Sequence, residues 1–121
     1  ELFLGYGIEA DGLRLYHSGD TIPFDGLAGR LAGFAADIAV LPVNGRDAER
    51  LAAGIPGNMT LAEAVDLAAR AGVPWLVPHH FGLFAFNTID EAAIDKAAEE
   101  TASPAIAKPI AGEMLALVRD D

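Results

Sequence analysis

The residues of this sequence that could do chemistry lie in two short stretches, one ending in an acid and one in two histidines. Residues 13–21 run from an apolar segment into His17-Ser18-Gly19-Asp20. Residues 75–82 run from a second apolar segment into a His79-His80 pair. In α/β folds, polar residues that follow parallel strands gather at one edge of the sheet. We therefore expect Asp20 and one of the two histidines to bind the same metal ion. The other histidine, whose side chain must diverge from its neighbour, is expected to orient a substrate or to support a ligand.

Simpler interpretations of both stretches stay open at this point. The order His17-Ser18-Gly19-Asp20 contains the residue types of a serine hydrolase, but adjacent side chains in an extended segment point apart and there is no Gly-x-Ser-x-Gly elbow. Asp20 alone is equally typical of a turn in which a carboxylate caps backbone amides. A single histidine near a strand is usually a packing residue, and two adjacent ones at a strand end are less easily explained that way.

Composition limits the class of protein. The chain has 121 residues, and 52% are hydrophobic and 21% charged, which predicts one folded domain over residues 1–121 and excludes disorder. Its 18 acidic and 8 basic residues give a net charge of −10, which disfavours binding to nucleic acid. Its apolar runs are too short for a membrane span, so we expect a soluble protein with no membrane partner. Without cysteine, any metal must be bound by histidine and carboxylate.

The ends of the sequence carry two further expectations. Nothing resembles a signal peptide, so a cytoplasmic location is expected. The chain begins with Glu1 inside apolar sequence, which suggests a piece of a longer protein.

The first half of the sequence predicts a hairpin followed by a helix and a buried strand. Residues 3–9 and 13–16 are typical of strands joined by an Asp-Gly turn. Residues 25–34 have helical periodicity. The nearly continuous apolar run at 37–43 indicates a strand buried on both faces.

The second half alternates helices and strands, so the predicted architecture is α/β with helices packed on a sheet. A polar loop at 44–59, with one helical turn around 48–53, leads to Thr60-x-x-Glu63, a capping box. The helix that starts there is expected to stop at Gly72 and to precede a strand at 75–78. A second capping box at Thr88 and Glu91 predicts a helix to about residue 100. Closing strands are expected at 105–108 and 114–118.

Four motifs in this order resemble the metallo-β-lactamase superfamily, and within it the ascorbate 6-phosphate lactonase-like branch. They are Tyr16-His17-Ser18-Gly19-Asp20-Thr21, Asn44-Gly45-Arg46-Asp47, Gly57-Asn58-Met59-Thr60 and Pro78-His79-His80-Phe81-Gly82. The resemblance covers essentially the whole chain, and the order of the four is more specific than any one of them.

The resemblance implies an αββα sandwich of two similar halves with a metal site at the edge between its sheets. Asp20 matches the carboxylate that bridges two ions, and His80 matches the last histidine ligand. His79 matches no ligand. Asn44, Arg46 and Asn58 match loops that line the pocket, which implies contacts with substrate; their alternative role is loop scaffolding, with Arg46 paired to a nearby acid.

The departure from the family pattern is as informative as the match. The family's His-x-His-x-Asp-His cluster is absent, and the chain has three histidines in all. The chain therefore resembles the C-terminal half of the fold, with an incomplete site. The missing N-terminal half, or a second copy of the chain, is expected to cover the exposed sheet face, as the mean hydropathy of +0.30 also suggests.

For the intact protein, the resemblance implies hydrolysis of a small molecule, a lactone or phosphorylated sugar acid, by water activated on Mn²⁺ or Zn²⁺. This chain alone is expected to be inactive. Two alternatives remain: a non-catalytic interaction module with the same fold, and a phosphodiesterase of the same superfamily that acts on nucleotides.

Overall fold

One five-stranded sheet organises the chain, whose computed structural model describes residues 4–118. The strands are β1 (Tyr6–Ala10), β2 (Leu13–His17), β3 (Ile38–Pro42), β4 (Trp75–His79) and β5 (Ala105–Ile106). The helices are α1 (Leu27–Phe34), α2 (Ala48–Ala52), α3 (Leu61–Arg70) and α4 (Glu91–Glu100). The strand order in the sheet is β1-β2-β3-β4-β5; β1 and β2 are antiparallel and the other neighbours are parallel. The predicted α/β class is confirmed.

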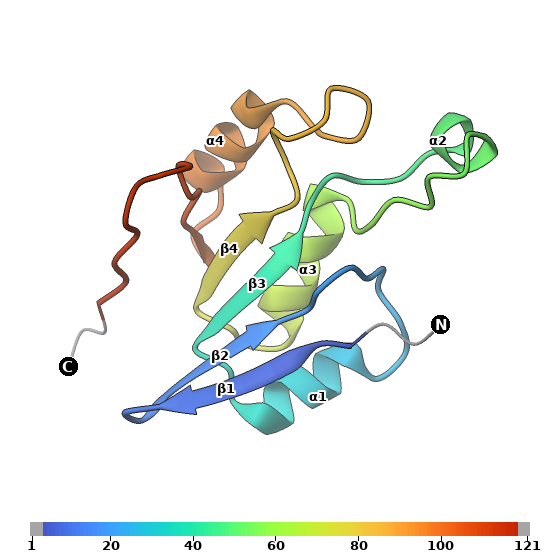
Figure 1. Ribbon diagram of the computed structural model, residues 1–121. Coiled ribbons are helices and arrows are strands. Elements are labelled where there is room, and N and C mark those ends of the chain that lie inside the picture. Colours follow the sequence, from blue (N-terminus) through green and yellow to red (C-terminus); the bar gives the residue numbers. More distant parts are fainter. Residues whose placement is uncertain (1–3, 119–121) are drawn as a thin grey trace.

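The topology places helices on one side of the sheet. Parallel crossovers are right-handed, and because the strand order follows the chain order, each crossover carries its helix to the same face. Figure 1 shows α1 and α3 together behind the sheet. The core lies between this face and the helices, where Ala39, Leu41 and Leu76 are 0% exposed and pack with Leu31 and Leu67.

The opposite face of the sheet has no helix over it, and we call it the open face. Its rows follow from the register: Leu15 pairs with Ile38, which pairs with Trp75, and Val40 pairs with Val77. These residues are apolar but only half-buried. The expectation that residues 37–43 form a strand buried on both faces is therefore wrong within the described residues, because Ile38 and Val40 are only half-buried; on this face of β3 only Pro42, at the strand end, is fully covered.

Local signals explain most of the element boundaries. The β1–β2 turn has positive φ at Asp11 and Gly12, as a type I′ hairpin requires. At the start of α3 the Thr60 hydroxyl accepts from Glu63 N and the Glu63 carboxylate accepts from Thr60 N, so the predicted capping box is confirmed.

Two further predicted features are wrong. Thr88 does not cap α4, because its hydroxyl accepts from Gly82 N; the carboxylate of Asp90 caps the helix by accepting from Ala92 N. Residues 114–118 form no strand: the sheet ends at the two-residue β5, and the apolar side chains of this segment stay largely exposed. Phe3, placed in the first predicted strand, lies outside the described residues.

None of the helices between residues 4 and 118 has the length and apolar character needed to cross a bilayer.

Candidate functional site

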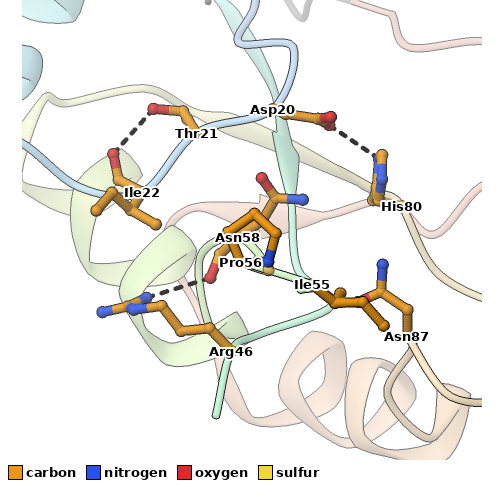
Figure 2. Close-up of a pocket in the computed structure, with 10 residues that line it drawn as sticks. Asp20, Thr21, Ile22, Arg46, Ile55, Pro56, Asn58, His80 and Asn87 are labelled. Carbon is orange, nitrogen blue, oxygen red and sulfur yellow. Dashed lines mark hydrogen bonds and ion pairs between the residues drawn. The ribbon is translucent and has the colours of Figure 1, made fainter. Parts of the chain in front are cut away.

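The carboxyl ends of β2 and β4 bring Asp20 and His80 together. Both strands run parallel to β3 and end at the same edge of the sheet. Asp20 follows β2 by three residues and His80 follows β4 directly. His80 Nδ1 lies 3.2 Å from Asp20 Oδ1 (Figure 2).

The backbone on both sides of this pair has special geometry. The loop after β2 is tied to β3 by the bond from Ser18 N to Val40 O. Gly19 has φ 61, and a Cβ there would lie 2.9 Å from Leu4 O, so only glycine fits. His80 has φ 67, a conformation that costs a non-glycine residue about 1 kcal/mol or more. Strain of this kind persists where surrounding contacts impose it, often at functional sites.

The Asp20–His80 pair is open to ligands. The side chains of His80 and Asp20 are 39% and 53% exposed. Among residues 4–118, no backbone amide donates to the Asp20 carboxylate, so the turn-capping role is not seen. The arrangement of a serine nucleophile is not seen either. The Ser18 hydroxyl donates to Gly19 O, and His17 Nδ1 accepts from Gly19 N.

The donor types and spacing of this pair fit a metal shell. Two ligands about 2.0–2.1 Å from a tetrahedral ion lie about 3.3 Å apart, close to the separation seen between Asp20 and His80. Within the described part of the chain, no cluster of three or more His, Cys, Asp or Glu side chains could hold an ion. The pair could therefore supply two ligands of such a shell, and the remainder would have to come from elsewhere.

A pocket of about 410 Å³ opens beside the pair. Its lining is Asp20, Thr21, Ile22, Arg46, Ile55, Pro56, Gly57, Asn58, His80 and Asn87. Figure 2 shows Asp20 and His80 above the loop that carries Ile55, Pro56 and Asn58. The pocket therefore combines a carboxylate–imidazole pair, an apolar wall and two amides.

The four predicted substrate contacts occupy different places. Arg46 and Asn58 line the pocket, whereas Asn44 is fully buried below it. His79 lies outside this pocket: it shares the open face with Val77, and its ring lies 4.7 Å from that of His17.

Arg46 is held by an acid. Its guanidinium donates to both oxygens of Glu63 and to Asn58 O. The hydrogen bonds from Arg46 lower the pKa of Glu63 to about 2. The same contact raises the pKa of Arg46. The bidentate pair joins Arg46 to the first turn of α3, and the bond to Asn58 O ties Arg46 to the loop at 54–60. Together these bonds use most of the donors with which Arg46 could bind an anion.

His79 is the reverse of His80 in its surroundings. His79 Nε2 is buried and has no hydrogen-bond partner among the described residues. Burial lowers the pKa of His79 to about 4, with a further contribution from His17 and His80. The ring is therefore neutral near pH 7, and the two adjacent histidines have diverged as expected.

Two residues of the site were missed by sequence reasoning, Arg50 and Asn87. Asn87 lines the pocket, and its Oδ1 accepts from Arg50 Nη1 and Asn44 Nδ2. Asn87 lies in the loop between β4 and α4, and only tertiary contact brings it to Arg50, 37 residues earlier in the chain. The visible signal was the long loop after a buried strand, which indicates a functional segment but no particular residue.

Comparison with known proteins identifies the fold family. Residues 1–81 match the family described as the beta-lactamase superfamily domain. The chain belongs to the metallo-β-lactamase superfamily. It is similar to a UPF0173 metal-dependent hydrolase of Methanosphaerula palustris, with 33% identity over 99 residues that are 80% of this chain and 40% of the relative. A UPF0173 metal-dependent hydrolase of Thermococcus onnurineus is 34% identical over 115 residues, 93% of this chain and 46% of the relative.

Solved structures agree with this assignment of the superfamily fold. Igni18, a metallo hydrolase of Ignicoccus hospitalis, superposes with a TM-score of 0.75 and 21% identity, covering 96% of this chain and 46% of that protein. YhfI of Bacillus subtilis, a metallo-beta-lactamase fold protein, gives 0.65 and 18%, covering 88% and 41%. The chain thus spans less than half the length of these relatives.

Proposed function

We propose that this chain is the C-terminal half of a metal-dependent hydrolase, with Asp20 and His80 as two ligands of its metal site. The observation that carries the proposal is the 3.2 Å approach of His80 Nδ1 to Asp20 Oδ1 at the mouth of a pocket. The relatives named metal-dependent hydrolases support the reaction class, and the strained backbone of His80 supports a functional role for that residue.

The residues present fit a divalent ion, Mn²⁺ or Zn²⁺, bound by oxygen and imidazole nitrogen. A bound divalent ion lowers the pKa of a coordinated water to near 7 and polarises a carbonyl or phosphoryl oxygen. In this proposal Asp20 and His80 would hold the metal, and the remaining ligands would come from outside this chain. Arg46 and Asn58 line the pocket where the substrate would be held, and Asn44 supports Asn58 by accepting a hydrogen bond from its Nδ2.

The missing part of the site belongs, in this proposal, to an N-terminal half that packs on the open face; a second copy of the chain is the alternative occupant. The open face supports this, because apolar residues such as Ile38 and Val40 are half-buried there and His79 Nε2 lacks a partner. The chain alone is then inactive. The substrate we propose is a lactone, in keeping with the branch that the four motifs resemble.

The test is reconstitution with a separately expressed N-terminal half from a UPF0173 relative. The mixture, supplied with Mn²⁺ or Zn²⁺, is assayed on panels of lactones and phosphodiesters. We expect lactone hydrolysis that is lost on D20N or H80Q and kept on D66N, a matched change at an exposed acid whose ion pair within residues 4–118 is with Arg70.

Three results would count against this account. If the complex forms but hydrolyses neither lactones nor phosphodiesters, the proposal of an enzyme is contradicted and a non-catalytic module is favoured. Turnover restricted to the phosphodiesters replaces the lactonase with a phosphodiesterase. Full activity in D20N would show that Asp20 is not a metal ligand.

A further inference from the structure

A chain of hydrogen-bonded amides begins at Arg50 and reaches the lining of the pocket. Arg50 Nη1 donates to Asn87 Oδ1 at 3.0 Å, and Asn44 Nδ2 donates to the same oxygen at 2.9 Å. Asn58 Nδ2 in turn donates to Asn44 Oδ1 at 3.0 Å. Arg50 is itself fixed, since Nη1 also donates to Asn44 O and Nε donates to Asp47 Oδ2.

The guanidinium determines which way each amide points. Arginine can donate hydrogen bonds but cannot accept them, so Asn87 must turn its oxygen toward Arg50. Asn44 must then present its nitrogen to that oxygen and its own oxygen to Asn58 Nδ2. Reversing any one of the three amides would set two donors or two acceptors against each other.

This order leaves one donor and one acceptor free at the pocket. Within residues 4–118, Asn87 Nδ2 has no acceptor and Asn58 Oδ1 has no donor, although both side chains line the pocket. Within these residues, His79 Nε2 is the one fully buried polar side-chain atom that lacks a partner. Asn87 Nδ2 and Asn58 Oδ1 are therefore not sealed in the core. Figure 2 shows the Asn87 nitrogen directed up the pocket on the side of His80.

The remaining lining argues against an anion at this place. The pocket contains the Asp20 carboxylate and the unpaired acceptor of Asn58, and its one cationic lining residue, Arg46, already bonds both oxygens of Glu63. Ile22, Ile55 and Pro56 form an apolar wall beside the amides. A neutral group that both donates and accepts hydrogen bonds matches these surroundings.

We propose that Asn58 and Asn87 form a subsite for a neutral donor–acceptor group of the substrate, such as a hydroxyl, and that Arg50 is the positioning residue that orients both amides. The inference rests on the proposed function for the view that this pocket receives the substrate. Its test measures binding without turnover, so the two proposals can fail separately.

The experiment compares three probes on the ¹⁵N-labelled chain by ¹H–¹⁵N NMR: acetamide, acetone and inorganic phosphate. Acetamide both donates and accepts, whereas acetone has nearly the same shape and only accepts. We expect acetamide to shift the side-chain amide signals of Asn58 and Asn87, with an affinity at least about fivefold above that of acetone, the value of about one hydrogen bond. Phosphate should leave these signals in place.

Two variants test the roles of the donor and of Arg50. N87D keeps the oxygen that faces Arg50 but replaces the free donor, so acetamide should bind at least about fivefold more weakly. R50M removes the guanidinium that orients the amides. The ratio of the acetamide affinity to the acetone affinity should therefore fall toward one. R70M, which removes only an exposed pair with Asp66, should leave the preference unchanged.

The proposal is overturned if acetone shifts the two amides as well as acetamide, if N87D keeps the preference, or if phosphate binds them more tightly than acetamide. Should R50M fail to fold, as its backbone spectrum would show, the probe comparison on the unaltered chain and N87D still decide.

Discussion

The two faces of the sheet are similar in composition and different in completeness. The helix-covered face puts Ala39, Leu41 and Leu76 at 0% exposure, while their neighbours Val40 and Val77 on the open face are only half-buried. Strand alternation alone decides which residue goes to which face. The difference teaches that the core behind the sheet is complete within this chain, whereas the open face and the Asp20–His80 edge are the parts that our proposal completes with a second half.

The largest expected effect is a loss of stability from a change on the helix-covered face. Leu76→Ala should lower the free energy of unfolding by about 2–5 kcal/mol, because it leaves a cavity in a packed core. Val77→Ala, the next residue on the same strand, should cost only about 1 kcal/mol since its side chain is already half in water. Urea denaturation of both variants measures the difference. Equal losses would show that the open face is as tightly packed as the covered one.

A smaller effect tests the histidine on the open face. In the unfolded chain His79 takes up a proton near its ordinary pKa of 6.5, but in the folded chain only near pH 4. The folded state therefore binds fewer protons between these values, and stability should fall as the pH falls from 6.5 to about 4.

His79→Leu removes this part of the pH dependence, which denaturation at a series of pH values will show. An unchanged slope between pH 6.5 and 5 in the variant would mean that His79 is not buried as described.

The smallest effect concerns the Arg46–Glu63 pair beside the pocket. Arg46 lowers the pKa of Glu63 from 4.5 to about 2, so the stabilisation is present above pH 4.5 and is lost as the pH falls through about 2. Because both side chains are partly exposed, E63Q should cost only about 1 kcal/mol at pH 7.

D66N, a change in the exposed Asp66–Arg70 pair, is the control and should cost less than about 0.5 kcal/mol. Thermal unfolding at pH 7 and pH 3 compares the two. If E63Q lowers the free energy of unfolding at pH 7 no more than D66N does, the Arg46–Glu63 pair does not stabilise the fold as described.

Sequence alone predicted the parts of this molecule that depend on local rules. The Asp-Gly hairpin and the capping box of Thr60 and Glu63 were predictable because each involves residues within a few positions of one another. The shared edge of parallel strands, which the apolar runs already indicated, predicted that Asp20 would meet one of the two histidines. The choice of His80 came from the resemblance to the superfamily.

The rest depended on contacts between distant segments. Thr88 has the spacing of a capping residue, but Gly82 N occupies its hydroxyl, so Asp90 caps the helix. The Arg50–Asn87 contact joins two segments that are far apart in the sequence. The sequence of neither segment predicts that it contacts the other. Residues 114–118 have strand-like composition, but composition does not provide a neighbouring strand with which to pair.

The most direct test of the central claim is a titration of the ¹⁵N-labelled chain with Mn²⁺, read as selective broadening of ¹H–¹⁵N signals. Because the ion broadens only nearby nuclei, weak binding is enough and no partner is needed. The account predicts that signals of residues 19–21 and 79–82 broaden first, and that D20N and H80Q each abolish the effect while D66N does not. Broadening spread evenly over the acidic surface, or unchanged in D20N, would contradict a metal site shared by Asp20 and His80.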